Sequence, residues 1–425
     1  MMESQQREPT AILVAVDAGG RGGDFVERSL DELEDLAKTN GFKVLERIVQ
    51  RLDQIDRATF VGSGKLIEIQ ARAEEIGAGY LIFDGQLSPA QTRGISEAID
   101  LKLSDRVTVI LSIFANRART DEGKIQVELA YLRYRLTQLT GRGVELSRLG
   151  GGTGTRGPGE TKLEQDRRAI RKRMATLRGE LRKMEERRER SRSLRDRRQI
   201  ITAAIVGYTN AGKSTLLNKL CDASLATGDQ LFMTLDPTAR RLDIRDGISL
   251  VLVDTVGFIR DLPKFLAQAF RATFEEAASA DLILLVADMS DPEAAAQIEV
   301  AQKQLQDLGA GSIPILYVLN KMDQVAADPY HDVMTLLRNE KTEQIAPVSA
   351  LTGEGMDDLV DRLASFVEET LISYQAIIPY KEAGLIAHAR DHGSVSEERY
   401  EDECIILSGL IRKSQIGPLL PWIEH

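Results

Sequence analysis

A glycine-rich loop that ends in a lysine and a serine carries the clearest chemistry in this sequence. It reads G-x-x-x-x-G-K-S, follows the apolar run 201–206 and precedes an expected helix over 215–220. Backbone N–H groups of such a loop surround phosphate oxygens, the lysine reaches the β- and γ-phosphates, and the serine hydroxyl binds Mg²⁺. Taken alone, the pattern also suits an ordinary turn between a strand and a helix. The predicted phosphate-binding residues are Gly207, Tyr208, Thr209, Asn210, Ala211, Gly212, Lys213, Ser214 and Thr215.

A D-x-x-G motif follows the apolar run 248–253 and fits the same nucleotide. The carboxylate of Asp254 can hold the Mg²⁺ shell through water, as a partner to the Ser214 hydroxyl. The N–H of Gly257 can approach a γ-phosphate because glycine has no intervening side chain. The motif consists of Asp254, Thr255, Val256 and Gly257.

An N-K-x-D motif and an S-A-L segment predict which base is bound. The carboxylate of Asp323 can accept both N1–H and the exocyclic amino group of guanine, a donor pair that adenine lacks. Asn320 would support the loop and the O6 and N7 side of guanine, the Lys321 stem would lie over the base, and the Ala350 N–H would meet O6. All these motifs follow apolar strands, at the edge where open α/β sheets bind ligands. The sequence therefore predicts a P-loop GTPase that takes GTP, yields GDP and uses Mg²⁺. The predicted guanine-binding residues are Asn320, Lys321, Met322, Asp323, Ser349, Ala350 and Leu351.

Composition limits the remaining possibilities. The 425 residues suggest about two to four domains, and 43% hydrophobic with 28% charged residues indicates a globular protein. No run of about 18 apolar residues and no apolar N-terminal segment occurs, so neither a membrane span nor a secretory signal is expected. Two cysteines and four histidines argue against a disulfide framework and against a dedicated transition-metal site. A cytoplasmic monomer is expected, and peripheral membrane association stays open.

Charge is distributed very unevenly. The net charge is −10, yet residues 116–198 hold 24 lysines and arginines against 12 aspartates and glutamates, a local net charge of +12 that leaves −22 for the rest. A basic module within an acidic protein indicates a polyanion site. Residues 114–139 and 160–198 read as long helices, and the glycine-dense stretch 141–159 between them reads as a loop, which predicts an antiparallel hairpin. A solvated helix face and a flexible hinge would explain the same composition. The predicted RNA contacts are Arg148, Arg156, Arg167, Arg168, Arg171, Lys172 and Arg173.

The flanking regions predict smaller α/β folds. Apolar runs alternate with amphipathic segments before residue 113, which predicts βαβ units and a mostly parallel sheet. Strands are expected at 11–16, 42–49, 80–83 and 106–111, and helices at 29–39, 64–76 and 88–99. After residue 372 a small α+β appendage is expected, with strands at 385–390 and 404–411 and a buried Cys404. The predicted domains are 1–113, 114–199, 200–372 and 373–425.

Three long segments resemble the HflX family of translation-factor-related GTPases. They are A-N-R-A-R-T-D-E-G-K-I-Q-V-E-L at 115–129, the glycine loop 150–160 and the D-T-V-G-F form at 254–258. The resemblance covers roughly residues 60–371. It implies an N-terminal α/β subdomain with a helical hairpin, a Ras-like domain, and binding to the large ribosomal subunit and its RNA. It also implies splitting or rescue of stalled ribosomes under stress. By resemblance, Thr234 is the switch threonine that ligates Mg²⁺ within Phe232, Met233, Thr234, Leu235 and Asp236.

One residue predicts a slow enzyme. Ras-like enzymes orient the attacking water with a glutamine after the D-x-x-G motif, where this chain has Phe258. Phenylalanine cannot form that hydrogen bond, so the residues expected to carry the chemistry are Lys213, Thr234 and Gly257. Ribosomal RNA or protein would complete the site, and Arg260 or Arg271 are weighed as arginine fingers against a surface role. The alternatives are a GTPase in ribosome assembly or tRNA modification, and a GTP-gated RNA-binding module with incidental hydrolysis.

Overall fold

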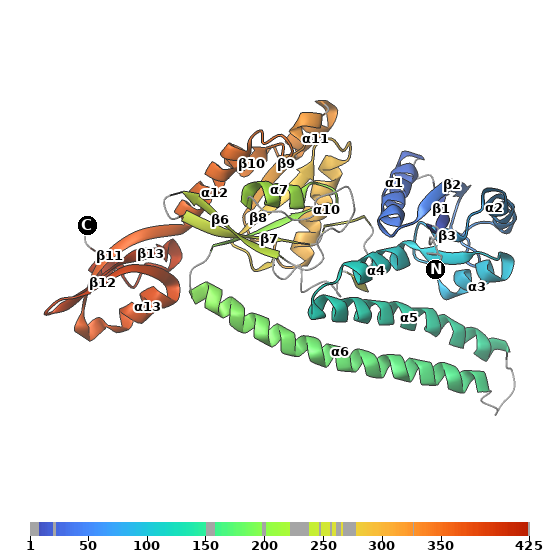
Figure 1. Ribbon diagram of the computed structural model, residues 1–425, viewed down its shortest axis with the longest axis horizontal. Coiled ribbons are helices and arrows are strands. Elements are labelled where there is room, and N and C mark those ends of the chain that lie inside the picture. Colours follow the sequence, from blue (N-terminus) through green and yellow to red (C-terminus); the bar gives the residue numbers. More distant parts are fainter. Residues whose placement is uncertain are drawn as a thin grey trace, which may run out of the picture. The chain divides into compact units, whose positions relative to one another are not determined.

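The computed structural model describes residues 8–19, 23–149, 158–197, 201–221, 238–245, 248–255, 257–260, 265–266, 278–325 and 327–423 (Figure 1). These residues form two compact units. The first contains the described residues up to Leu181 together with Ile259, Arg260 and residues 265–266. The second contains the described residues from Arg182 to Phe258 and from 278 onward. The predicted mixture of a parallel α/β subdomain, a basic hairpin, a P-loop domain and a small α+β appendage is confirmed.

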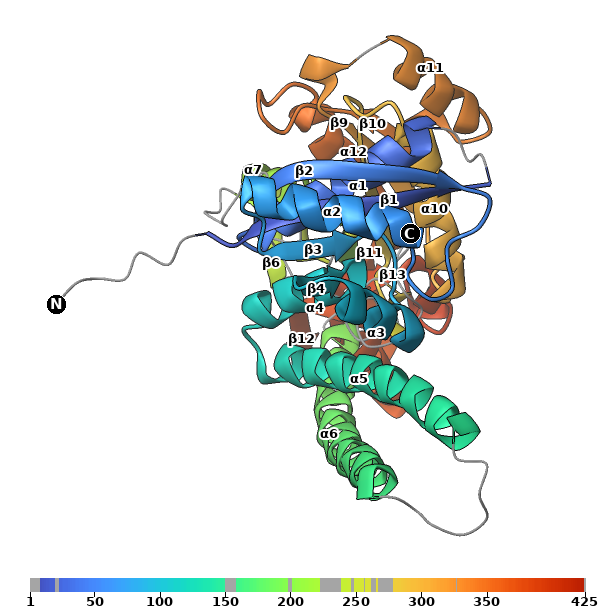
Figure 2. The same ribbon diagram turned by 90° about the vertical axis from the view of Figure 1, so that its right-hand side faces the viewer.

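The first unit is built on a four-stranded parallel sheet in the order β2-β1-β3-β4, seen as stacked strands in Figure 2. The apolar side chains Ile12 and Val14 of β1 pack against Leu66 and Ile69 of α2 and Ile95 of α3. The strands are β1 (Thr10–Ala18), β2 (Lys43–Leu52), β3 (Tyr80–Phe83) and β4 (Lys102–Asp105). The helices are α1 (Gly23–Thr39), α2 (Ser63–Ile76), α3 (Pro89–Ala98) and α4 (Arg106–Arg117).

The strand predicted over 106–111 is wrong, because these residues begin helix α4. The β-branched run 107–110 is typical of a strand, but Asp105 caps a helix here. Its carboxylate accepts a hydrogen bond from the Thr108 N–H at 2.8 Å, and the Thr108 hydroxyl accepts one from the Asp105 N–H at 2.8 Å. Val107, Val109, Ile110 and Leu111 are all buried. Capping and burial on several sides outweigh the modest helix penalty of β-branched residues.

Helices α5 (Asp121–Leu149) and α6 (Pro158–Arg197) form the predicted hairpin, and they lie side by side in Figure 1. Leu129 and Leu132 of α5 pack against Ile170, Met174 and Leu177 of α6. The loop predicted from residue 141 is wrong at its start, because α5 continues through Gly141 and Gly143 to Leu149. Each glycine costs a helix only about 1 kcal/mol relative to alanine, so two of them do not end a 29-residue helix.

Two polar side chains fasten α5 to the sheet of the first unit. The Tyr134 hydroxyl donates to the Asp105 carboxylate at 2.8 Å, and the Leu87 N–H donates to the same oxygen at 3.0 Å. Gln138 donates to the Leu87 carbonyl at 2.8 Å. The base of the hairpin is therefore fixed at the carboxyl end of β4.

The second unit contains a six-stranded sheet in the order β10-β9-β8-β5-β7-β6, in which only β6 is antiparallel to its neighbour. Two of its strands match the apolar runs 201–206 and 248–253. The strands of the sheet are β5 (Thr202–Gly207), β6 (Thr238–Arg245), β7 (Ile248–Asp254), β8 (Leu282–Asp288), β9 (Ile315–Asn320) and β10 (Ile345–Pro347). The helices described with it are α7 (Lys213–Cys221), α10 (Ala294–Asp307), α11 (Ala327–Leu336) and α12 (Met356–Thr370). All four predicted motifs therefore lie at the carboxyl ends of β5, β7, β9 and β10.

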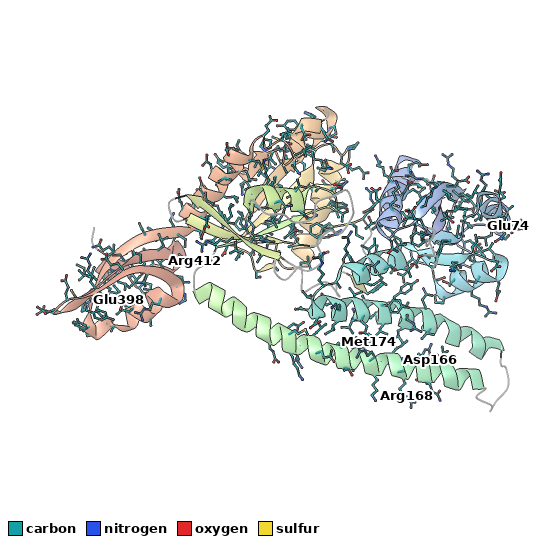
Figure 3. All side chains as sticks on the ribbon, in the orientation of Figure 1. Glu74, Asp166, Arg168, Met174, Glu398 and Arg412 are labelled. Carbon is teal, nitrogen blue, oxygen red and sulfur yellow. The ribbon has the colours of Figure 1, made fainter. Side chains whose placement is uncertain are left out.

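The C-terminal segment forms an antiparallel sheet in the order β11-β13-β12, covered by helix α13. The strands are β11 (Leu371–Pro379), β12 (Gly393–Tyr400) and β13 (Cys404–Arg412), and α13 spans Gly384–His392. The strand predicted at 385–390 is thus wrong, because Ile386 and Ala389 pack one helical face onto the sheet. Cys404 is only half-buried rather than buried. Arg412, labelled in Figure 3, pairs with Asp281 and ties this sheet to the residue before β8.

Candidate active site

The phosphate loop is held in a closed conformation around Lys213. The lysine is 8% exposed, and its Nζ donates to the carbonyls of Gly207 at 3.1 Å and Tyr208 at 2.6 Å. Burial lowers the pKa of Lys213 to about 8, and the nearby Asp254 carboxylate opposes that shift. A phosphate group would replace these carbonyls as the partner of the ammonium.

Gly212 shows why this loop needs glycine. It has a φ of +90°, and a Cβ here would lie 2.2 Å from Asn320 Nδ2. The side chain of Asn320 occupies that space because it donates to the Ala211 carbonyl at 2.8 Å. Its own Oδ1 accepts the Ala350 N–H at 3.0 Å. Asn320 therefore braces the phosphate loop against the segment after β10, and the Ala350 N–H that was expected to meet guanine O6 is engaged by Asn320 in this structure.

The base-recognition residues are oriented by their own neighbours. Asp323 is exposed, and its Oδ1 accepts a hydrogen bond from the Ser349 hydroxyl at 2.6 Å. This bond is the largest cause that lowers the pKa of Asp323, so the carboxylate is ionised at neutral pH and ready to accept two donors. Lys321 has a φ of +63°, and its Nζ lies 2.6 Å from the Asp288 carboxylate. Asp288, the last residue of β8, was not predicted from the sequence, although its place at the carboxyl edge was a usable signal.

The D-x-x-G motif lies beside the phosphate loop. The Ser214 hydroxyl donates to the fully buried Asp254 carboxylate at 3.3 Å, which brings together the two predicted metal ligands. Hydroxyl and carboxylate oxygens are the donors that Mg²⁺ prefers. A Cβ on Gly257 would lie 3.0 Å from the backbone Cα of Thr209 and 2.8 Å from Lys213 Nζ, so glycine permits this close approach. Thr255, also predicted, donates to the Ile205 carbonyl at 2.7 Å and holds β7 against β5.

Family models match most of the chain. Residues 27–115 match the model described as GTP-binding GTPase N-terminal, 117–195 the GTP-binding GTPase Middle Region, 202–321 the 50S ribosome-binding GTPase and 334–416 the HflX C-terminal domain. The chain belongs to the HflX family of GTPases.

Relatives of this HflX family member align with it over nearly its full length. GTPase HflX of Lacrimispora saccharolytica is 44% identical over 97% of this chain and 95% of its own length. GTPase HflX of Escherichia coli is 39% identical over 92% of this chain and 90% of its own length. The solved complex of the protein SsGBP with GDP is similar in structure, with a TM-score of 0.50 and 26% identity, over 84% of this chain and 98% of that one. The chain is therefore a GTPase.

Phe258 of this HflX family member is held by its backbone. Its N–H donates to the Gly207 carbonyl at 2.9 Å, and its carbonyl accepts the Thr209 N–H at 2.8 Å, so residues 208 and 258 form a parallel bridge. The ring is 1% exposed. The residue in the usual glutamine position thus contributes a buried apolar side chain.

Arg260 has partners within the first unit. The Arg260 guanidinium lies 5.1 Å from the centre of the Phe25 ring. The backbone N–H of Arg260 donates to the Glu32 carboxylate at 3.1 Å. Glu32 also pairs with the buried Arg106, which contacts Asp84 at 2.8 Å. Burial raises the pKa of Glu32, against the lowering effect of Arg106. No sequence spacing pointed to Glu32, because its partner lies 228 residues away.

Several predicted residues lie outside the described part of the chain. They are Phe232, Met233, Thr234, Leu235, Asp236, Val256, Arg156 and Arg271. Arg148 lies in α5, and its side chain is also outside the description. The Mg²⁺ role of Thr234 stays a prediction from the family resemblance.

Proposed function

We propose that this GTPase is a molecular switch that binds the large ribosomal subunit and promotes splitting or rescue of stalled ribosomes. The ribosome would stimulate its hydrolysis of GTP. The matched GTPase model is described as 50S ribosome-binding, which supports the partner. The basic hairpin supports RNA as the contacted surface, because residues 116–198 carry a local net charge of +12. The proposal describes a cytoplasmic monomer.

The proposed chemistry uses few side chains of this chain. Lys213 would bind the β- and γ-phosphates, and Asp323 would hold guanine. Ser214, Asp254 and Thr234 would hold Mg²⁺, which supplies charge neutralisation on the phosphates when bound. The Gly257 N–H would donate to the γ-phosphate.

The buried ring of Phe258 carries the activation part of the proposal. Hydrolysis needs a positioned water, and positioning contributes several kcal/mol to a reaction of this kind. Phe258 offers neither a donor nor an acceptor on its side chain. We therefore infer that ribosomal RNA or protein completes the water-binding geometry.

Sedimentation of large ribosomal subunits with the full chain and GTP, GDP or a non-hydrolysable GTP analogue tests the partner and its nucleotide dependence. We expect binding with GTP and the analogue, and release with GDP. In parallel, turnover of GTP should rise about tenfold or more when subunits are added. Lys213→Ala should abolish the nucleotide dependence. A turnover that stays unchanged with added subunits would contradict the proposed activation.

The predicted RNA contacts on α6 divide into two groups. Arg167 is largely buried and donates to the Leu139 carbonyl at 3.1 Å, and Arg173 makes two 2.7 Å hydrogen bonds to Glu128. These two hold α6 to α5. Arg168 points away from α5 in Figure 3, whereas Met174 lies between the helices. The other predicted contacts on α6 are the exposed residues Arg168, Arg171 and Lys172, while Arg148 and Arg156 stay predictions outside the described side chains.

Arg168→Glu should therefore weaken binding to the large subunit about tenfold and reduce its salt slope by about one or two, since a phosphate contact becomes a repulsion. The matched control is Arg93→Glu, which reverses an exposed arginine on α3. Sedimentation at several salt concentrations measures the affinity and the salt slope of each variant. Equal effects of the two variants would show that the exposed face of α6 contacts solvent and not ribosomal RNA.

A further inference from the structure

A groove of about 380 Å³ runs between α4 and α5 in the first unit. Leu111, Ala115 and Ala118 form an apolar wall, and Val127 and Tyr131 face them from α5. The groove lies at the base of the basic hairpin and takes no part in the nucleotide chemistry described above. Its size falls within the range of about 300–1,000 Å³ that is typical of small-ligand sites.

The residues that α5 contributes to this groove are spaced three or four positions apart. Lys124, Glu128 and Tyr131 line the groove and lie four and three residues apart, and Arg135 follows on the same face of the helix, one turn beyond the lining residues. Tyr131 is 47% exposed, so its ring is accessible from the groove. The Arg135 guanidinium lies 5.9 Å from the centre of its ring. The groove therefore presents an accessible aromatic side chain next to a cation.

This face of α5 is positively charged, because its acidic residue Glu128 is paired with an arginine of α6. Glu128 is neutralised by Arg173 of α6, which also lowers the pKa of its carboxyl. The Lys124 side chain is 59% exposed and lies 4.0 Å from Asp121, an exposed pair that contributes little. Lys124 and Arg135 are thus the two cations on this face of α5, on either side of Tyr131.

We propose that this groove binds one unstacked RNA base, a site that rests on the ribosome-binding function proposed above. Single-stranded RNA is recognised by stacking of splayed bases on aromatic side chains and arginine planes, with phosphates held by nearby cations. Tyr131 supplies the aromatic surface, the α4 wall supplies the apolar floor, and Lys124 and Arg135 supply the cations. An apolar side chain of a protein could fill the same floor, but it would gain nothing from the two cations.

Variants of the full chain at Tyr131 test the site on isolated large ribosomal subunits with a non-hydrolysable GTP analogue. Tyr131→Ala should weaken binding about tenfold, which is within the range of one lost base–aromatic stack. Tyr131→Phe should bind like the unmodified chain, because the ring and not the hydroxyl is used. The control is Ile67→Ala, which truncates a side chain that is 72% exposed on α2 of the same unit. Affinity for GTP should be equal in all four proteins.

A photoreactive benzoylphenylalanine at position 131 identifies the occupant directly. Crosslinking to ribosomal RNA is expected. Normal binding by Tyr131→Ala, or crosslinking to a ribosomal protein, would overturn this site while the ribosome-binding function stands. Failure of the unmodified chain to sediment with the subunit would overturn both.

Discussion

The two ends of the nucleotide site differ in how completely the chain itself prepares them. At the guanine end, Ser349 orients the Asp323 carboxylate and Asp288 anchors Lys321. At the γ-phosphate end, the residue that follows the D-x-x-G motif is a buried phenylalanine. Its backbone forms two hydrogen bonds with the phosphate loop. Among the residues that the structure describes, the predicted base contacts are held by neighbouring side chains, whereas the position after the D-x-x-G motif has no side chain that could orient a water. This difference supports the proposal that the ribosome stimulates hydrolysis.

The largest effect is expected at the guanine end. Asp323→Asn removes a charged acceptor of two hydrogen bonds, each of which is worth about 1.5–3 kcal/mol. GTP affinity should fall about 100-fold or more, measured by titration with a fluorescent guanine nucleotide. The thermal unfolding temperature should change little because Asp323 is exposed.

Xanthosine triphosphate provides the control for that variant, because xanthine carries a carbonyl where guanine carries its amino group. An asparagine amide can donate to that carbonyl, so the variant should bind the xanthine nucleotide more tightly than GTP. Equal loss of affinity for both nucleotides would mean that Asp323 supports the loop rather than reading the base.

An intermediate effect is expected from pH at the phosphate end. Burial lowers the pKa of Lys213 to about 8 in the nucleotide-free protein, and bound phosphates would raise it again. Below pH 8 the lysine is already charged, so GTP affinity should be flat. Above pH 8 binding must take up a proton, so the dissociation constant should rise by up to about tenfold per pH unit. Titrations between pH 7 and 9, with calorimetry in two buffers, measure both the slope and the proton uptake.

Lys213→Arg is the matched control, because arginine stays charged throughout this range. Its affinity should be lower but independent of pH. A pH slope that persists in this variant would assign the proton to another group.

The sequence predicted the positions of the P-loop domain well because its strands are short apolar runs that end in chemically distinctive motifs. It failed at 106–111 and 385–390, where apolar residues form helices. The β-branched run after Asp105 carries no periodic signal, since the helix is buried on several faces. Only the paired capping contacts of Asp105 and Thr108 distinguish it, and they depend on geometry.

In the candidate site too, some features could be predicted from the sequence and others could not. Residue types and spacing were sufficient to select Lys213, Asp254 and Asp323 as candidates, because phosphate, metal and guanine each favour particular side chains, and their binding roles stay predictions. The sequence predicted that Asn320 supports the loop, but it did not predict the partners that this side chain contacts. The brace formed by Asn320 between two loops depends on residues 109 and 30 positions away, and no local pattern encodes such a contact.

The smallest effect is expected at Phe258, and it tests the comparison most directly. Phe258→Leu keeps a buried apolar side chain and both backbone hydrogen bonds, so the unstimulated turnover of GTP should stay within about twofold. Stability should fall by only about 1 kcal/mol. Single-turnover hydrolysis, with and without large ribosomal subunits, measures the effect. If the ring itself shaped the water site, the unstimulated rate would drop well beyond tenfold, and the γ-phosphate end would then be as fully prepared as the guanine end.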